Sequence, residues 1–200
     1  MEIKKFVSLD MDENCYAVTV NEECFIVDPG EFSKELESFA LENKERIKYI
    51  LLTHCHFDHI MGVFALKNVC KNALVVAHSM EIDGLRSPNI NLSQFFCGQS
   101  ICLIADKTVE DGESFKVGTE NISVLHTPGH TKGSVCYKIG NILFSGDTLF
   151  KKSYGRTDFP GGSMLELKHS LEKLSTLEGD IKVCCGHGQD TTIKEEFNFR

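Results

Sequence analysis

Apolar residues along the chain gather in short runs of about four to eight positions, bounded by polar residues, glycine or proline. Runs of this length that are rich in valine, isoleucine and phenylalanine predict β-strands, and the DG, KVG and IGN turns between the later runs indicate hairpins. The expected strands cover residues 14–20, 24–28, 47–53, 73–77, 101–105, 113–118, 122–127, 134–140, 141–146 and 180–185. The run at 47–53 (IKYILLT) is too continuously apolar to face water on one side, so we expect it to be buried on both faces.

Helical periodicity, with apolar residues three and four positions apart, marks further segments. Helices are expected over residues 33–44 and 59–70 and from residue 163 onward. Ser33 can cap the first helix, and Ser163 with Glu166 forms a capping box for the last. The apolar face of that last helix comprises Met164, Leu167, Leu171 and Leu174. Because helices alternate with hairpin strands and no linker interrupts them, we expect one layered α/β (α+β) domain over residues 1–200.

Composition and charge narrow the class of protein. Of 200 residues, 42% are hydrophobic and 25% charged, as in soluble globular proteins. No apolar run approaches the ~18 residues of a membrane-spanning helix, and no signal-peptide core is visible. The net charge of −8, without a basic run, argues against nucleic acid as a partner. We therefore expect a cytoplasmic protein that acts on a small molecule rather than on nucleic acid or a membrane, in an oligomeric state that the sequence does not reveal.

The nine cysteines form no CxxC pair and no disulfide framework. Several lie in apolar segments, where cysteine behaves as a small hydrophobic residue. These are Cys15, Cys24, Cys70, Cys102, Cys136 and Cys184. So many free thiols are typical of a reducing compartment.

The segment THCHFDHIMG holds three histidines and an aspartate within six positions. In an extended chain alternate side chains point to the same side, so His54 and His56 can bind one metal ion together. Asp58 and His59, one turn further on, can reach a second ion. Core packing does not favour three titratable rings beside a carboxylate, so we interpret the HxHxDH string as metal-binding. The same alternation turns Cys55 away from the metal.

Three further candidates stand at the end of an apolar strand that enters a turn-prone loop: His130, Asp147 and His187. Loops at strand ends are where a rigid scaffold presents functional side chains, so we expect these loops to converge on one cavity. Two imidazole-rich groups linked by a carboxylate describe a dinuclear hydrolytic centre. We assign no metal to the remaining histidines, which are His78, His126 and His169.

The motifs HCHFDH, HTPGHT, FSGDTLF and CCGHG occur in the order and settings of the metallo-β-lactamase fold superfamily, which the chain resembles over nearly its whole length. The resemblance implies a four-layer αββα sandwich with the site at one edge. It implies that metal 1 is held by His54, His56 and His130, that metal 2 is held by Asp58, His59 and His187, and that Asp147 bridges them. Nitrogen and oxygen donors suit two divalent ions, zinc first, with iron or manganese as alternatives.

Within this superfamily, β-lactamases of the main zinc class carry a cysteine at the position of Asp147, which argues against antibiotic hydrolysis. Flavodiiron proteins carry a glutamate at the position of His56, and RNA-processing members carry a basic arm. This chain has a histidine at that position and no basic run, so the sequence argues against both branches. The chain is most similar to single-domain glyoxalase II-like (hydroxyacylglutathione hydrolase-like) enzymes, through the segments LFKKSYGRTDFPGGS and GHGQDTTIKEEFNF. Only 13 residues follow His187, so we expect no C-terminal glutathione-binding helical domain.

These features predict a metal-dependent hydrolase of small thioesters, S-D-lactoylglutathione or a related acyl-thiol, with a metal-bridging hydroxide as nucleophile. A thiolate whose conjugate acid titrates near ~8.5 departs without a proton, whereas an amine needs a positioned acid. The motifs offer no spare acid, although Asp58 can shuttle a proton while it binds metal. The alternatives are a persulfide dioxygenase with one iron on His54, His130 and Asp147, a lactone or ester hydrolase of the same fold, and a metal or redox sensor that uses the cysteines.

The loop after Asp147 carries a local group of cationic and aromatic side chains: Lys151, Lys152, Tyr154 and Arg156. In a chain of net charge −8, such a loop beside the site can bind a substrate carboxylate. The other interpretation is that Arg156 pairs with Asp158 and braces the loop.

Overall fold

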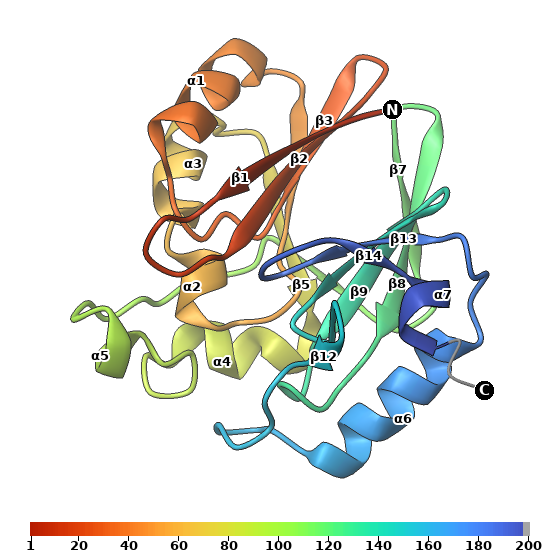
Figure 1. Cartoon of the computed structure of the whole chain (residues 1–200). Coiled ribbons are helices and arrows are strands. Elements are labelled where there is room, and N and C mark those ends of the chain that lie inside the picture. Colours follow the sequence, from red (N-terminus) through yellow and green to blue (C-terminus); the bar gives the residue numbers. More distant parts are fainter. Residues whose placement is uncertain (198–200) are drawn as a thin grey trace.

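Two six-stranded β-sheets pack face to face in the computed structural model of the chain, which describes residues 1–197 (Figure 1). The first sheet has the order β1 (Glu2–Val7), β2 (Asn14–Val20), β3 (Glu23–Val27), β4 (Ile47–Leu51), β5 (Leu74–His78), β6 (Lys107–Val109). The second has the order β14 (Thr191–Thr192), β13 (Lys182–Cys185), β10 (Ile142–Gly146), β9 (Val135–Ile139), β8 (Glu120–His126), β7 (Ser114–Val117). Strands β3 to β6 run parallel to one another, as do β10 and β13, so their carboxyl ends share an edge.

Helices cover the outer faces of the two sheets, which confirms the αββα sandwich (Figure 1). Helices α1 (Lys34–Asn43) and α3 (Val63–Val69) pack on the first sheet, and α6 (Met164–Ser175) packs on the second. The shorter elements are α2 (Phe57–Ile60), the 3-10 turn η1 (Ser79–Glu81), α4 (Ile82–Arg86), α5 (Ser93–Phe96), the hairpin β11 (Leu149–Phe150) and β12 (Ser153–Tyr154), and α7 (Ile193–Phe197). Within residues 1–197, none of the helices has the length and apolar character needed to cross a membrane.

The central strands are buried on both faces. In β2, Tyr16 and Val18 pack between the sheets, whereas Cys15 and Ala17 pack against the helical layer. The run at 47–53 also packs on both of its faces, as expected, although Lys48 within it is exposed. Both faces of these strands are therefore apolar, and the two-residue period of a half-exposed strand is lost.

Both predicted N-cap bonds are present, but the capping box at Ser163 is only half formed, because the Ser163 backbone nitrogen donates to the carbonyl of Gly129 rather than to Glu166. The Ser33 hydroxyl accepts a hydrogen bond from the backbone nitrogen of Leu36 at 3.2 Å, and the Ser163 hydroxyl accepts one from that of Glu166 at 3.3 Å. The helix that follows Ser163 buries Leu167 and Leu174, but Met164 on its predicted apolar face is exposed. The caps therefore locate the helix starts more reliably than the apolar pattern locates the buried face.

The strand predicted at 101–105 is wrong. Ile101 and Leu103 are buried, while Cys102 and Ile104 are exposed, so the alternation of a strand is present. The backbone nitrogen of Leu103, however, donates to the carbonyl of Leu85 in α4, and the segment joins no sheet. Cys102, expected to behave as a small hydrophobic residue of that strand, is exposed.

The helix predicted at 59–70 is divided into α2 and α3 at Gly62. The backbone nitrogen of Gly62 donates to the carbonyl of Pro29 at 2.8 Å, and a side chain at Gly62 would meet that oxygen at 2.6 Å. The close approach of the Pro29 loop therefore sets the break. Strand β1 was not predicted, because Phe6 is its one buried residue.

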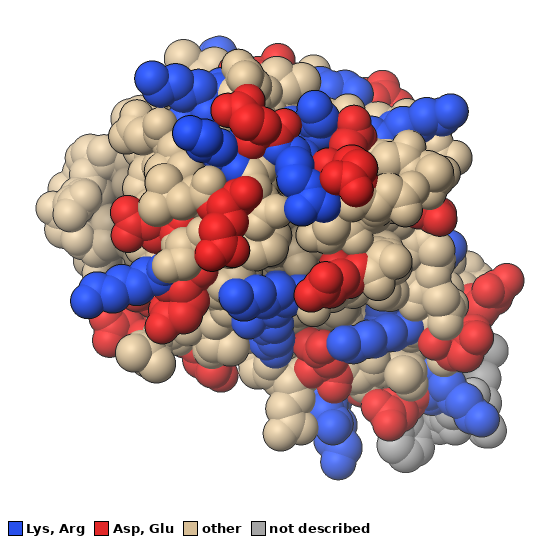
Figure 2. Space-filling model, turned by 90° about the horizontal axis from the view of Figure 1, so that it is seen from above, with Lys and Arg blue, Asp and Glu red and all other residues tan. Residues whose placement is uncertain are grey.

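Surface charges are interspersed on the face shown in Figure 2, where acidic and basic side chains lie next to one another. All nine cysteines fall within the described residues and are free, so no disulfide braces the fold. The end of the GHGQDTTIKEEFNF segment, residues 198 and 199, lies outside the described residues.

Candidate metal centre

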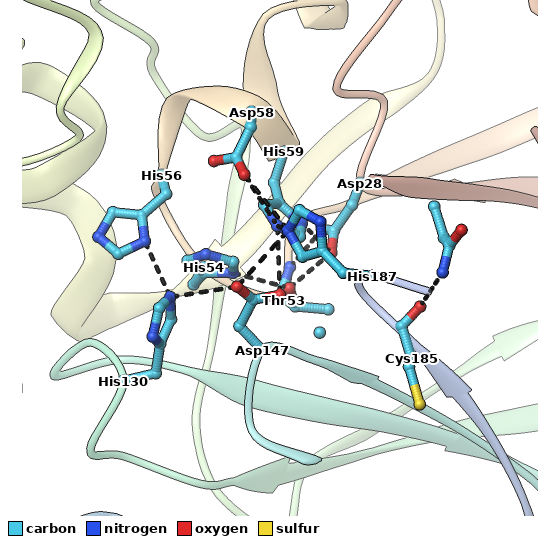
Figure 3. A network of polar contacts seen from close by, with 12 residues as sticks. Asp28, Thr53, His54, His56, Asp58, His59, His130, Asp147, Cys185 and His187 are labelled. Atoms are coloured by element: carbon cyan, nitrogen blue, oxygen red, sulfur yellow. Dashed lines mark hydrogen bonds and ion pairs between the residues drawn. The ribbon is translucent and has the colours of Figure 1, made fainter. Parts of the chain in front are cut away.

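The loops at the carboxyl ends of β4, β8, β10 and β13 meet at one edge of the sandwich (Figure 3). All seven predicted ligands lie there. His54, His56, Asp58 and His59 come from the end of β4 and from α2, His130 from the β8–β9 loop, Asp147 from the residue after β10, and His187 from the segment after β13. The expectation that loops at strand ends converge therefore identified a set of side chains that the fold brings together.

The seven side chains form two groups of three with Asp147 between them. Ligand atoms of His54, His56 and His130 lie within 4.8 Å of one another, and so do those of Asp58, His59 and His187. The Asp147 carboxylate reaches both groups. Its Oδ1 lies 3.3 Å from Nε2 of His59, and its Oδ2 lies 3.5 Å from Nε2 of His130 and 3.7 Å from Nε2 of His187.

The donor atoms of this centre suit metal ions rather than a network of hydrogen bonds. The Nε2 of His54 and the Oδ1 of Asp147 are buried, and neither has a hydrogen-bond partner among the described residues. Nδ1 of His56 faces Nε2 of His130 at 2.9 Å. Buried lone pairs that converge without a donor favour a bound cation, and nitrogen and oxygen donors suit zinc, iron or manganese.

Acceptors behind the rings set the tautomers of three histidines. Nδ1 of His130 donates to the carbonyl of Arg156 at 2.7 Å, and Nδ1 of His187 donates to the carbonyl of Met11 at 3.1 Å. Nδ1 of His59 faces the Asp28 carboxylate at 3.0 Å. Because a carbonyl and an ionised carboxylate only accept, these Nδ1 atoms carry the protons. Each Nε2 is left as a lone pair that points into the centre, as metal-binding histidines require.

Electrostatics also favour a cation in this centre. Burial, together with His130, lowers the pKa of His56 to about 3, and burial lowers that of His54, so both rings are neutral ligands at neutral pH. Burial acts to lower the pKa of His59, but Asp147 and Asp58 raise it overall. Positive charge is thus favoured between the carboxylates and these rings, whether protons or a metal ion carry it.

A cavity of about 430 Å³ opens onto the centre. Its remaining lining consists of Phe57, Leu92, Phe96, Phe150, Arg156 and Phe159. Of the side chains predicted to bind substrate, only Arg156 lies on this cavity. Tyr154 lines a different cavity beside Phe197, and Lys151 extends to the side-chain oxygen of Gln189 at 3.2 Å.

The β11–β12 hairpin explains this difference. It turns tightly at Lys152, whose φ is +61°, so Lys151 and Tyr154 lie away from the metal cavity. Arg156 donates to both carboxylate oxygens of Asp158 at 2.7 Å. Its guanidinium also lies 3.9 Å from the ring centroid of Phe159. The contacts of Arg156 therefore agree with the interpretation in which it pairs with Asp158 and braces the loop.

The other residues considered in the sequence lie outside the centre. His78 stacks on His126 with ring centroids 4.1 Å apart, and His169 is exposed. Cys55 is buried on the far side of its strand end, where its sulfur would collide with a side chain at Gly84. The alternation that aims His54 and His56 into the centre turns Cys55 away from it.

Three acidic residues near the centre were not predicted. Asp28 supports His59, and it follows an apolar strand just as the ligand candidates do, so the same signal could have found it. Glu81 is buried, and its Oε1 accepts from the Thr131 hydroxyl at 2.8 Å and from the backbone nitrogen of Gly133 at 2.6 Å, in the loop that carries His130. Glu13 is also buried, and neither of its carboxyl oxygens has a hydrogen-bond partner among residues 1–197. No sequence pattern marks the last two.

Comparison with known proteins places the chain in a family. The model of the metallo-beta-lactamase superfamily matches residues 10–187. "Probable metallo-hydrolase YqgX" of Bacillus subtilis (strain 168) is 34% identical over 187 residues, which cover 92% of this chain and 88% of that protein. The crystal structure of BLEG-1 B3 metallo-beta-lactamase has a TM-score of 0.90 and 35% identity over 98% of this chain and 97% of its own. TTHA1623 in a di-iron-bound form has a TM-score of 0.84 and 30% identity over 96% of each chain. The chain therefore belongs to the metallo-beta-lactamase superfamily.

Proposed function

We propose that the protein is a dinuclear metallohydrolase that cleaves small thioesters. The observation that carries this proposal is the position of Asp147, whose carboxylate lies within 3.3 to 3.7 Å of rings from both three-residue groups. A carboxylate shared between two such groups is the arrangement that two-metal hydrolytic sites use. Similarity to a protein named as a metallo-hydrolase supports the same reaction class.

In this proposal each group of three holds one ion. His54, His56 and His130 would bind metal 1, Asp58, His59 and His187 would bind metal 2, and Asp147, whose carboxylate reaches both groups, would be shared between them. Zinc, iron and manganese all suit these donors. Because TTHA1623 has a di-iron-bound form, iron should be tested first together with zinc.

Divalent ions held by these residues would supply a Lewis acid for the substrate carbonyl and would lower the pKa of a water from 15.7 toward ~7. The chain itself fixes the orientation of three rings. His59, His130 and His187 donate hydrogen bonds to the Asp28 carboxylate and to the carbonyls of Arg156 and Met11, respectively. Asp58 lines the cavity, and its side chain is 18% exposed, so it is placed to pass a proton to the departing group. A thiolate leaves without such help, because its conjugate acid titrates near ~8.5. Thioesters therefore make the smallest demand on this set of side chains, with activated esters and lactones next.

A second candidate reaction is β-lactam hydrolysis. It is favoured by the similarity to BLEG-1, which is described as a B3 metallo-beta-lactamase. Breaking an amide requires a proton on the leaving nitrogen, which would have to come from Asp58, one of the two carboxyl groups, with Asp147, that line the cavity. The two reactions share the centre and differ in the substrate that they accept.

One set of measurements tests the proposal. Protein purified without oxygen is assayed for metal content and then for release of thiol from a small thioester, with a lactone and a penicillin in parallel. Two metal equivalents per chain and thiol release are expected. A single iron, together with oxygen uptake on glutathione persulfide, would instead identify a persulfide dioxygenase. Hydrolysis of penicillin alone would select the second candidate.

A further inference from the structure

One wall of the cavity beside the metal centre is built from phenylalanine rings of three separate segments. Phe57 of α2 and Phe96 of α5 stack with ring centroids 5.8 Å apart and planes 11° from parallel. Phe159 meets Phe96 edge-on at 6.1 Å. It also meets the His56 ring at 5.7 Å, so the aromatic wall is continuous with the metal ligands.

The segment that presents this wall is held in a specific conformation. Leu92 lines the cavity with φ at +69°, a left-handed conformation that a leucine rarely adopts. The buried Asn91 fixes it, because its side chain donates to the carbonyl of Ile101 at 2.9 Å and accepts from the nitrogen of Ser93 at 3.0 Å. The carbonyl of Asn91 also accepts from the nitrogen of Phe57 at 2.8 Å. The wall is thus joined to the ligand-bearing helix α2, and strain of this kind is typical of binding sites.

Part of the wall is exposed although it is apolar: Phe57 is buried, but Phe96 is not. Phe96 is 58% exposed at the mouth of the cavity. Large exposed apolar surfaces rimmed by polar groups mark places where a ligand or partner binds. Here the surface is concave and opens on the metal ligands, so the group that covers it belongs to the substrate.

The lining outside the candidate metal ligands offers few partners for charged groups. Among those described residues Arg156 is the one cationic side chain, and both Asp158 oxygens already accept from it. A carboxylate or ammonium group on the acyl half of a thioester would need a polar partner when it leaves water. The aromatic wall offers none.

We propose that the protein hydrolyses thioesters with an uncharged, apolar acyl group, which packs against Phe57, Phe96 and Phe159 while the thiol half extends toward solvent. This inference rests on the proposed function and names its substrate class. The cavity volume of about 430 Å³ lies within the range of about 300–1,000 Å³ in which small-molecule sites fall.

The test uses one neutral thiol, N-acetylcysteamine, joined to acetyl, butanoyl, hexanoyl and phenylacetyl groups, with S-lactoylglutathione for comparison. In the metal-loaded protein, kcat/KM is expected to rise about fourfold per added methylene until the wall is covered. The Phe96→Ala variant should flatten this rise. Phe95→Ala is the matched control, because Phe95 is the neighbouring residue of α5, is 66% exposed and does not line the cavity.

A binding measurement separates this inference from the proposed function. Ketone analogues, in which a methylene replaces the thioester sulfur, are titrated by calorimetry against both variants. Chain-length-dependent affinity that Phe96→Ala loses and Phe95→Ala keeps supports the acyl site, even if no thioester is cleaved and the proposed function fails. Thioester cleavage that is insensitive to acyl length, or fastest with S-lactoylglutathione, would overturn the acyl site and leave the proposed function in place.

Discussion

The Oδ2 of Asp28 lies 3.0 Å from Nδ1 of His59, and both side chains are almost completely buried. The same carboxylate accepts from the Thr53 backbone nitrogen at 2.7 Å and from the Thr53 hydroxyl at 2.6 Å. Asp28 is therefore held in place by the residue that precedes the ligand string. It orients the His59 ring and keeps its Nε2 free for metal.

Replacement of Asp28 by asparagine should weaken metal binding without removing a ligand. The amide can no longer accept from Thr53 and His59 as a charged group, so the His59 ring loses its fixed tautomer. Loss of such a supporting carboxylate lowers metal affinity about 10- to 100-fold. Competition with a chromophoric chelator measures the affinity for each metal ion. We expect the affinity for one of the two ions to fall.

The control for this variant is Asp180→Asn, at an exposed carboxylate outside the centre. It should bind metal like the unmodified protein. If Asp28→Asn also keeps both equivalents at full affinity, Asp28 supports the Thr53 loop alone and has no part in metal binding.

Substitutions at Cys55 and His56 should separate neighbouring positions of the HxHxDH string. Cys55→Ser should retain two metal equivalents per chain, because the sulfur faces Gly84 rather than the centre. His56→Ala should lose one equivalent, because His56 and His130 share the first group. Metal analysis of both variants after gel filtration checks the difference. Loss of metal from Cys55→Ser would contradict the alternation argument.

The convergence of the seven candidate ligands could be predicted from the sequence because each follows an apolar strand, and strands of this kind are recognisable from local composition. Parallel strands then deliver their carboxyl ends to one edge, whatever the length of chain between them. The side chains expected to bind substrate could not be placed in this way. Their direction depends on a two-residue turn at Lys152, and nothing in the surrounding composition reveals the positive φ there.

Errors in the fold have a similar origin. Residues 101–105 alternate like a strand, but a strand also needs a neighbour with free backbone groups. The carbonyl of Leu85 takes the nitrogen of Leu103 instead, and that pairing joins positions 18 residues apart in the chain, from a region without a clear pattern. The buried Glu81 was missed for the same reason, since its partners in the 131–133 loop come from the other sheet.

Removal of the Glu81 carboxyl should destabilise the fold and loosen the His130 loop together. In Glu81→Ala, the Thr131 hydroxyl and the Gly133 nitrogen lose a buried acceptor, and each unsatisfied group costs about 1–3 kcal/mol. Urea unfolding of the chelator-treated protein measures the loss. Glu81→Gln keeps an acceptor oxygen, so it should lose less stability and bind metal more tightly than Glu81→Ala. Equal stability of all three proteins would show that these bonds make no net contribution.

Asp190 should make the stability of the fold depend on pH in the acidic range. Burial acts to raise the pKa of this carboxyl, but the hydrogen bond from Lys182, the charge of Lys5 and the Tyr16 hydroxyl lower it overall. The folded pKa therefore lies below the unfolded value of about 3.9. The ionised group stabilises the fold above that pH, and this contribution is lost as the pH falls through the folded pKa.

Replacement of Asp190 by asparagine should consequently lower the free energy of unfolding at pH 7 by about 1 kcal/mol, and the difference from the unmodified protein should shrink as the pH falls below about 4. Unfolding in urea at a series of pH values, with metal removed by chelator, measures both quantities. The exposed Asp10→Asn serves as the control for the change in net charge. A difference that stays constant down to pH 2 would mean that Asp190 stabilises the β13 edge through its shape and neutral hydrogen bonds rather than through its charge.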